Sequence, residues 1–343
     1  MTATQIKFSS ELTTKLQFAI DDKTKPIGAL GQVEHLALQI GLIQNTEHPN
    51  VDKAAAFVFG GDHGVCAEGV NPFPQVVTEQ MLANFAAGGA AMSVFCQANG
   101  IAMNVINMGI VNGDVRWPNV QHAAIACGTE NFKVKPAMSK QQCQQAMQVG
   151  EQLAQKAVNE GYNLLMIGEM GIGNTTSASA LLSSLLDIEP SKTVGPGTGA
   201  NEAQQALKVD VIKVALARAG KLELSVDALA EFGGFEIAAM VGFLIAAAKL
   251  RTPVIVDGFI STIAALVAEK DNPGLSQCWV FAHRSAEPAH TEMLTALSAK
   301  PLLDLQLRLG EGTGAALAYP ILKCAVAMLN NMATFSSAGI SES

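Results

Sequence analysis

The chain has 343 residues, of which 49% are hydrophobic and 15% are charged, and its formal net charge at pH 7 is −8. This balance is typical of a globular protein with a large core and excludes an intrinsically disordered chain. The acidic charge and the lack of a Lys/Arg cluster also argue against a binder of nucleic acid or of an anionic membrane, so we expect a small-molecule partner.

Two features of the sequence bear on where the protein works. The N-terminal segment MTATQIKFSSELTTK contains no continuous apolar run of the kind that marks export, so we expect a cytoplasmic protein. The longest apolar stretch, residues 237–248, is shorter than the ~20 residues of a membrane-spanning helix and predicts a buried helix instead.

The six cysteines are scattered without a CxxC pair, which argues against structural zinc.

Taken in chain order, five short apolar runs predict buried parallel strands, because each is followed by a glycine-rich or polar turn. They are residues 55–59, 103–108, 163–167, 253–256 and 279–282. Between them lie segments with apolar residues three and four positions apart, which is typical of helices. Ser139 and Gln142 form a capping-box pattern at the start of one of these helices.

This alternation of strand and helix predicts an α/β fold, a three-layer α/β/α, Rossmann-like arrangement around a mostly parallel sheet. We expect residues 51–311 to form a large α/β catalytic domain. The two ends of the chain, residues 1–50 and 312–343, are mainly helical in pattern and are expected to form a small helical satellite domain.

The ligands of such sheets bind at the carboxyl ends of the strands, so function is expected in four turns, residues 60–64, 168–176, 257–259 and 283–290. The second of them, GEMGIGNTT, matches the P-loop spacing GxxxxGK[ST] except that Asn174 replaces the lysine. Without that charge we do not expect an NTPase, but the N–H groups at the helix start could hold a single phosphate. The alternative is a tight strand-to-helix turn that binds nothing.

Two glutamates are candidates for chemistry. Glu311 lies between glycines in RLGEGTGA, residues 308–315, just before a long apolar helix. A carboxylate there could be a positioned base or an ordinary loop residue. Glu169 is open to the same two interpretations.

Asp62, His63, His283 and His290 invite a metal-site interpretation. No HxxxH or HxH pair occurs, however, and ligand spacing is the discriminating sign of such sites. We therefore expect hydrogen-bonded turn residues at these positions and no metal.

Several segments together resemble one family, the nicotinate-nucleotide:5,6-dimethylbenzimidazole phosphoribosyltransferases of cobalamin nucleotide-loop assembly. In chain order, the segments are KTKPIGALG (23–31), GDHGV (61–65) with EGV (68–70), PQVVTEQM (74–81), GEMGIGNTTS (168–177), GPGTG (195–199), GGFEIAA (233–239), DGFIS (257–261), HRSAEPAH (283–290) and PLLDLQLRLGEGTGAA (301–316). Each is a weak signal alone, but their number, order and spacing make the resemblance specific.

The resemblance implies roles for individual residues. Glu311 falls on the position of the general base, and Glu169 on that of a second carboxylate near the reacting sugar. The other residues implied to bind substrate are Gly171, Gly173, Asn174, Thr175, Thr176 and Lys208 around the ribose 5′-phosphate, Pro74, Gln75, Gln80, Met170 and Leu309 around the aromatic base, and Asp257, Ser285, Gly310, Gly312 and Thr313. A homodimer is implied as well.

The reactants implied are nicotinate mononucleotide and a benzimidazole-type base. Nicotinate mononucleotide already carries a pyridinium leaving group, so its C1′–N bond can break as oxocarbenium character builds up, and we expect no metal or cofactor. Glu311 would accept the proton that the attacking azole loses, and attack from the opposite face would invert C1′ and give α-ribazole 5′-phosphate. Two alternatives stay open, a hydrolase with water as the acceptor and a nucleotide-binding regulatory subunit.

Overall fold

The computed structural model describes residues 6–113, 116–197 and 199–340. Within these ranges six strands form one parallel sheet in the spatial order β3-β2-β1-β4-β5-β6. The strands are β1 (Ala54–Gly61), β2 (Ala102–Gly109), β3 (Val120–His122), β4 (Leu164–Met170), β5 (Val254–Val256) and β6 (Trp279–Phe281). Five of them confirm the predicted apolar runs. The sequence missed β3 because only one of its three residues is buried, so no apolar pattern marks it.

Both faces of the sheet are buried. In β1, Phe57 and Phe59 enter one core cluster while Ala56 and Val58 enter a second one, because successive side chains of a strand point to opposite faces. A strand of this kind must be apolar throughout, which explains why the strands read as continuous apolar runs.

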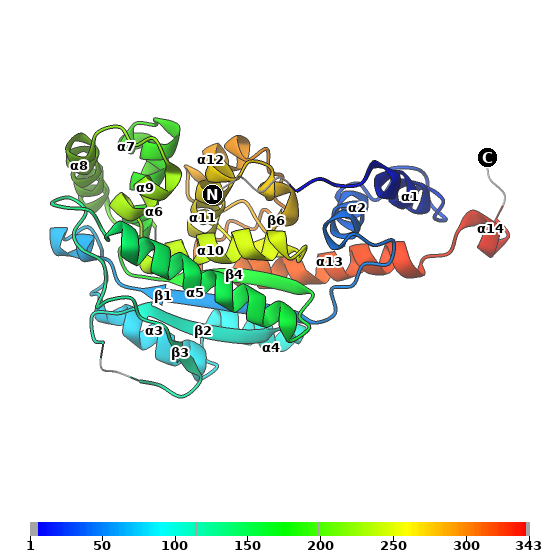
Figure 1. Ribbon diagram of the computed structural model, residues 1–343, viewed down its shortest axis with the longest axis horizontal. Coiled ribbons are helices and arrows are strands. Elements are labelled where there is room, and N and C mark those ends of the chain that lie inside the picture. Colours follow the sequence, from blue (N-terminus) through cyan, green and yellow to red (C-terminus); the bar gives the residue numbers. More distant parts are fainter. Residues whose placement is uncertain (1–5, 114–115, 198, 341–343) are drawn as a thin grey trace.

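Helices cover the two faces as separate layers (Figure 1). The first layer contains α5 (Lys140–Asn159), α6 (Asn174–Leu186), α7 (Pro190–Thr193), α8 (Glu202–Ala219), α9 (Ser225–Phe232), α10 (Phe235–Lys249), α11 (Phe259–Asp271) and α12 (His290–Ala296). The second contains α1 (Ser10–Asp21), α2 (Gln32–Gln44), α3 (Val76–Ala86), α4 (Ala91–Asn99) and α13 (Thr313–Asn331). Short elements complete the chain: η1 (Gly64–Glu68), η2 (Leu275–Cys278) and α14 (Phe335–Ala338). The predicted three-layer α/β/α fold is confirmed.

Two predicted helices can be compared directly. The Ser139–Gln142 capping box is present at the start of α5, with the Ser139 hydroxyl accepting from the Gln142 amide. The apolar stretch 237–248 lies within α10, which is buried along almost its whole length.

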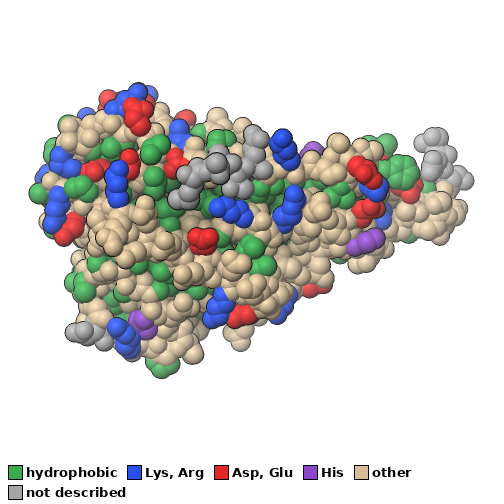
Figure 2. Space-filling view, viewed as in Figure 1, with side chains coloured by type: hydrophobic (Ala, Val, Ile, Leu, Met, Phe, Trp, Pro, Cys, Tyr) green, Lys and Arg blue, Asp and Glu red, His purple; other side chains and the backbone are tan. Residues whose placement is uncertain are grey.

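The two ends of the chain meet beside the sheet. Lys23 donates from Nζ to the Met332 carbonyl at 2.9 Å, and the Thr24 amide donates to the Ala333 carbonyl at 3.0 Å. Figure 1 shows α1, α2 and the end of α13 extending away from the sheet, and in Figure 2 this part forms a narrower extension of the molecule. The division into domains at residues 50 and 311 remains a prediction.

Two described segments, Val76–Asn99 and Thr313–Asn331, have the length and mean hydropathy of a membrane-spanning helix. The first consists of two separate helices, α3 and α4. The second is α13, and 61% of its apolar part is buried against the rest of the protein. Packing within the fold thus explains much of the apolar character of α13, whereas only 33% of the apolar part of the first segment is buried.

The strand order places a crevice at a known position. In a doubly wound sheet of this order, the chain leaves β1 and β4 in opposite directions, and ligands bind outside the carboxyl ends of these strands. GGDHG (60–64) forms the end of β1 and the turn that follows it, and the lysine-free glycine loop follows β4. These two motifs therefore meet at the switch point of the sheet.

Candidate active site

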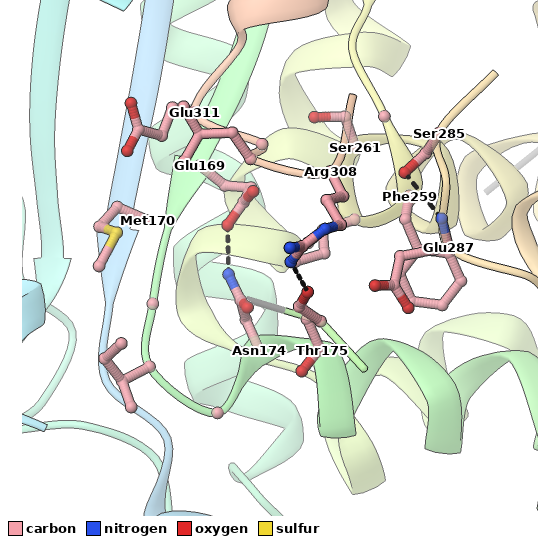
Figure 3. Close-up of a pocket in the computed structure, with 18 of the residues that line it drawn as sticks. Glu169, Met170, Asn174, Thr175, Phe259, Ser261, Ser285, Glu287, Arg308 and Glu311 are labelled. Atoms are coloured by element: carbon pink, nitrogen blue, oxygen red, sulfur yellow. Dashed lines mark hydrogen bonds between the residues drawn. The ribbon is translucent and has the colours of Figure 1, made fainter. Parts of the chain in front are cut away.

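A pocket opens at the carboxyl ends of β4, β5 and β6 (Figure 3). It gathers segments that are far apart in the sequence, including the loop that precedes α13. The predicted site residues that line it are Glu169, Met170, Gly171, Gly173, Asn174, Thr175, Lys208, Asp257, Ser285, Leu309, Gly310 and Glu311. The expectation that post-strand turns build the site is met by three of the four turns.

Glu169, near the end of β4, is buried at the base of the pocket. Its carboxylate accepts a hydrogen bond from Asn174 Nδ2, and Figure 3 shows the two side chains pointing toward one another. Burial, together with the nearby carboxylates of Glu236, Asp257 and Glu311, raises the pKa of Glu169 to about 8. Asn174, which stands where a P-loop has its lysine, thus directs its side chain to a carboxylate.

Glu311 is held in an unusual backbone conformation. Its φ of 67° lies in the left-handed region, between Gly310 at 81° and Gly312 at 94°, and a non-glycine residue there costs of order 1–2 kcal/mol. Burial and then the Asp257 charge raise the pKa of Glu311 to about 7, against the opposing effect of the Met92 amide. Glu311 Oε2 is buried without a partner among the described residues. The carboxylate is therefore available to accept a proton from a ligand.

Asp257 explains how the Glu311 loop is held. Its two carboxylate oxygens accept from the amides of Gly312 and Ala315, each at 3.1 Å, so it caps the start of α13. The absence of a Cβ at Gly168 lets the loop approach β4, because a Cβ there would lie 2.3 Å from the Glu311 carbonyl oxygen. Glu311 is thus positioned by β4 and β5 together.

The glycine loop after β4 forms the start of α6. The first N–H groups of a helix have no partner within the helix and carry partial positive charge, which suits an anion. Lys208, from α8, is buried and donates to Thr175 Oγ1 at 3.3 Å. A cation and a helix start therefore converge on one end of the pocket, as a phosphate cradle requires.

The GGDHG turn lies behind this loop and does not line the pocket. A Cβ on Gly171 would lie 2.5 Å from the Gly61 carbonyl oxygen, and His63 packs against Gly171 and Gly173. His63 is itself held by Glu236 at the start of α10, with Nε2 and Oε1 2.7 Å apart and both side chains buried. The GGDHG turn therefore supports the glycine loop by packing against it.

The two histidines of the 283–290 turn have non-metal partners as well. His283 Nε2 lies 3.5 Å from Asp257 Oδ1, and this carboxylate raises the pKa of His283 although burial alone would lower it. His290 accepts from the Ser285 amide and contacts Thr262, and burial lowers its pKa to about 3. Among the described residues, no group of three or more His, Cys, Asp or Glu side chains is arranged to hold a metal.

Some predicted site residues lie outside the pocket lining: Pro74, Gln75, Gln80, Thr176, Gly312 and Thr313. Gln75 donates to the His63 carbonyl at 3.0 Å, and Thr313 donates to the Gly310 carbonyl at 2.7 Å, so both hold turns of the site. Gln80 is exposed and Thr176 is buried. The apolar residues Phe73, Met170 and Leu309 line the pocket. The role of the 74–81 segment around the aromatic base stays a prediction.

Two charged residues of the pocket were not predicted from the sequence, Glu287 and Arg308. Arg308 donates to the Gly197 carbonyl at 2.9 Å, and Glu287 is buried near Lys208. Glu287 belongs to the HRSAEPAH motif and Arg308 to the RLGEGTGA motif, in which other residues were the candidates. Only the folded chain brings these two side chains to the end of the pocket that contains Thr175. Of the GPGTG motif, Thr198 is outside the described residues.

Comparisons with known proteins agree with this geometry. A family model described as "Phosphoribosyltransferase" matches residues 7–340. The nicotinate-nucleotide–dimethylbenzimidazole phosphoribosyltransferase of Ralstonia nicotianae is 48% identical over 337 residues, covering 98% of this chain and 95% of the relative. The protein of the same name from Aromatoleum aromaticum is 48% identical over 331 residues, 96% of each chain. The crystal structure of CobT from Thermus thermophilus matches with a TM-score of 0.94 at 40% identity, over 97% of this chain and 100% of that one.

Proposed function

Since the chain belongs to the nicotinate-nucleotide–dimethylbenzimidazole phosphoribosyltransferase family, we propose that it transfers the 5-phosphoribosyl group from nicotinate mononucleotide to 5,6-dimethylbenzimidazole. The products would be α-ribazole 5′-phosphate and nicotinate, in cobalamin biosynthesis. The observation that carries this proposal is one pocket that combines a lysine-assisted cradle, two buried carboxylates and an apolar wall.

The chemistry of the pocket indicates where each part of the two substrates would bind. The 5′-phosphate binds at the start of α6 beside Lys208, and the ribose lies over Glu169. The aromatic base lies toward Met170 and Leu309, on the side where Figure 3 shows Glu311. The attacking nitrogen then reaches C1′ from the face opposite the departing pyridine, which inverts that carbon.

Glu311 acts as the general base in this proposal. A base works best when its pKa is close to the pH of the reaction, and the pKa of Glu311 is raised to about 7. Its unpartnered Oε2 takes the proton that the azole loses as the new C1′–N bond forms. Glu169, when ionised, stabilises the positive charge that develops on the sugar.

The test is incubation of the purified protein with nicotinate mononucleotide and dimethylbenzimidazole, followed by mass and NMR analysis of the product. Glu311→Gln should retain binding of nicotinate mononucleotide but lose about 10²- to 10⁴-fold in kcat. Glu292→Gln, on the exposed face of α12, is the matched control and should keep the wild-type rate. A wild-type rate in Glu311→Gln removes Glu311 from the base role, and ribose 5-phosphate formed without any acceptor base supports a hydrolase instead.

We further propose that the enzyme works in the cytoplasm as a homodimer. Light scattering after size exclusion should then give twice the mass of one chain, and a single-chain mass at assay concentration would contradict the dimer.

A further inference from the structure

The phosphate end of the pocket contains a carboxylate, which has the wrong charge for an anion site. Glu287 is 5% exposed and lines the pocket, and its Oε1 is buried without a partner among the described residues. Figure 3 shows Glu287 at the end of the pocket away from Glu311. A buried carboxylate oxygen that lacks a hydrogen-bond partner is costly, which points to a functional reason for a glutamate at this position.

The charged groups that face Glu287 come from two elements. Lys208 extends from α8, and Arg308 lies in the loop before α13. The Gly197 amide also points to the carboxylate, and a Cβ on Gly195 would lie 2.1 Å from Oε2. Burial raises the pKa of Glu287 in spite of these groups, and burial lowers the pKa of Lys208, an effect that Glu287 opposes. The charge of each of these two buried groups thus favours the charged form of the other, against the effect of burial.

The charge at this end changes when a phosphate arrives. A phosphate monoester carries about 1.5 to 2 negative charges near neutral pH. Lys208 and Arg308 can balance a dianion, but an ionised Glu287 would then add a third negative charge in a site of low dielectric constant. Like charges at close range favour protonation of one of the groups.

We propose that Glu287 makes this end of the pocket specific for a single phosphate group. Its carboxylate is the counter-ion of Lys208 before substrate binds; when the phosphate takes over that position, Glu287 takes up a proton from solvent and donates a hydrogen bond to a phosphate oxygen. Glu287 is thereby a specificity-determining residue, and nucleotide binding is coupled to proton uptake. The inference rests on the proposed function for the place of the 5′-phosphate.

The test measures proton uptake directly. Nicotinate mononucleotide is titrated into the protein without an acceptor base, by calorimetry at about pH 8 in buffers of different ionisation enthalpy, because the ligand phosphate is then a dianion. The wild type should take up a proton on binding. Nicotinate riboside, which lacks the phosphate, should bind without this uptake.

Variants assign the proton to Glu287. Glu287→Gln should abolish the uptake, whereas Glu311→Gln and the exposed control Glu292→Gln should retain it. The wild type also gives a measurement that depends on no variant: its Kd for nicotinate mononucleotide should weaken by up to about tenfold per pH unit above the pKa of Glu287, while that for the riboside stays flat.

The outcomes separate the two proposals. Binding of nicotinate mononucleotide with equal proton uptake in the wild type and Glu287→Gln overturns this inference and leaves the proposed function standing. A pH-independent Kd for the wild type does the same. Lack of binding by nicotinate mononucleotide overturns the proposed function and this inference with it.

Discussion

At the scale of single residues, the buried carboxylates of the site differ in what already holds them. Asp257 accepts from two amides at the start of α13, Glu169 accepts from Asn174, and Glu236 pairs with His63. Glu311 Oε2 has no partner among the described residues; the same is true of Glu236 Oε2, but Glu236 does not line the pocket. The sequence left Glu169 and Glu311 open to the same interpretations, and these contacts favour Glu311 as the base.

The Asn174 side chain should matter for Glu169 and not as a substitute for the P-loop lysine. In Asn174→Ala, Glu169 loses its hydrogen-bond donor, so its pKa should rise further and kcat at neutral pH should fall. Loss of a buried hydrogen-bond partner should also lower the free energy of unfolding by about 1–3 kcal/mol. Denaturant unfolding and steady-state kinetics measure both effects.

The matched control for this change is Asn159→Ala, at the exposed end of α5. It should leave kcat and the free energy of unfolding close to those of the wild type. If Asn174→Ala also kept the wild-type kcat and free energy of unfolding, the contact between Asn174 and Glu169 would contribute to neither activity nor stability.

At the scale of elements, the site depends on the contact between β4 and the loop before α13. The two backbones touch at Gly168 and Glu311. Asp257, which follows β5, stabilises the same loop by accepting a hydrogen bond from the Gly312 amide. The left-handed backbone of Glu311 is held by these contacts, since strained conformations persist where their surroundings determine them. A small change in β4 should therefore act on Glu311.

Gly168→Ala tests that contact. The new methyl group would meet the Glu311 carbonyl at 2.3 Å, so the loop must move away from β4. We expect a loss of at least ~10²-fold in kcat, because displacing a catalytic group by about 1 Å costs this much. Kinetics together with a crystal structure of the variant would measure the displacement.

Gly220→Ala is the control at the end of α8, where nothing lies within 4 Å of an added Cβ and φ is 66°. It should lose about 1 kcal/mol of stability through backbone strain and keep the wild-type kcat. Equal kcat in Gly168→Ala and the wild type would show that the Glu311 loop tolerates displacement.

At the scale of the whole molecule, buried acids link stability to pH. The pKa values of Glu169 and Glu311 are raised to about 8 and about 7 in the folded protein, above the ordinary value of 4.5. Between the ordinary and the raised values, the unfolded chain has released protons that the folded protein still binds. The stability from these two groups is therefore fully present below about pH 4.5 and declines as the pH rises toward about 8.

The measurement is the free energy of unfolding from denaturant titrations across this pH range. Glu169→Gln should flatten the decline, and it should be more stable than the wild type at about pH 8 while nearly equal to it at about pH 5, where Glu169 is protonated. An unchanged slope in Glu169→Gln would mean that Glu169 is ionised without penalty in the folded protein. Glu292→Gln is again the exposed control.

The sequence by itself determined the class of fold and the segments that make the site. Parallel strands buried on both faces must be apolar, and ligands of such sheets bind in the turns that follow, so local patterns were sufficient for both predictions. The resemblance added the identity of the two glutamates, which the turn motifs alone could not separate from ordinary loop residues.

Only the tertiary structure decided which side chains meet. Lys208 reaches Thr175 across 33 positions of the chain, and Asp257 holds Gly312 across 55. Glu287 and Arg308 join the same end of the pocket as Thr175 from still more distant segments. No local pattern encodes such contacts, because they depend on how the strands are ordered in the sheet. The electrostatics of the site follow from the same cause, since burial and neighbouring charges exist only in the folded chain.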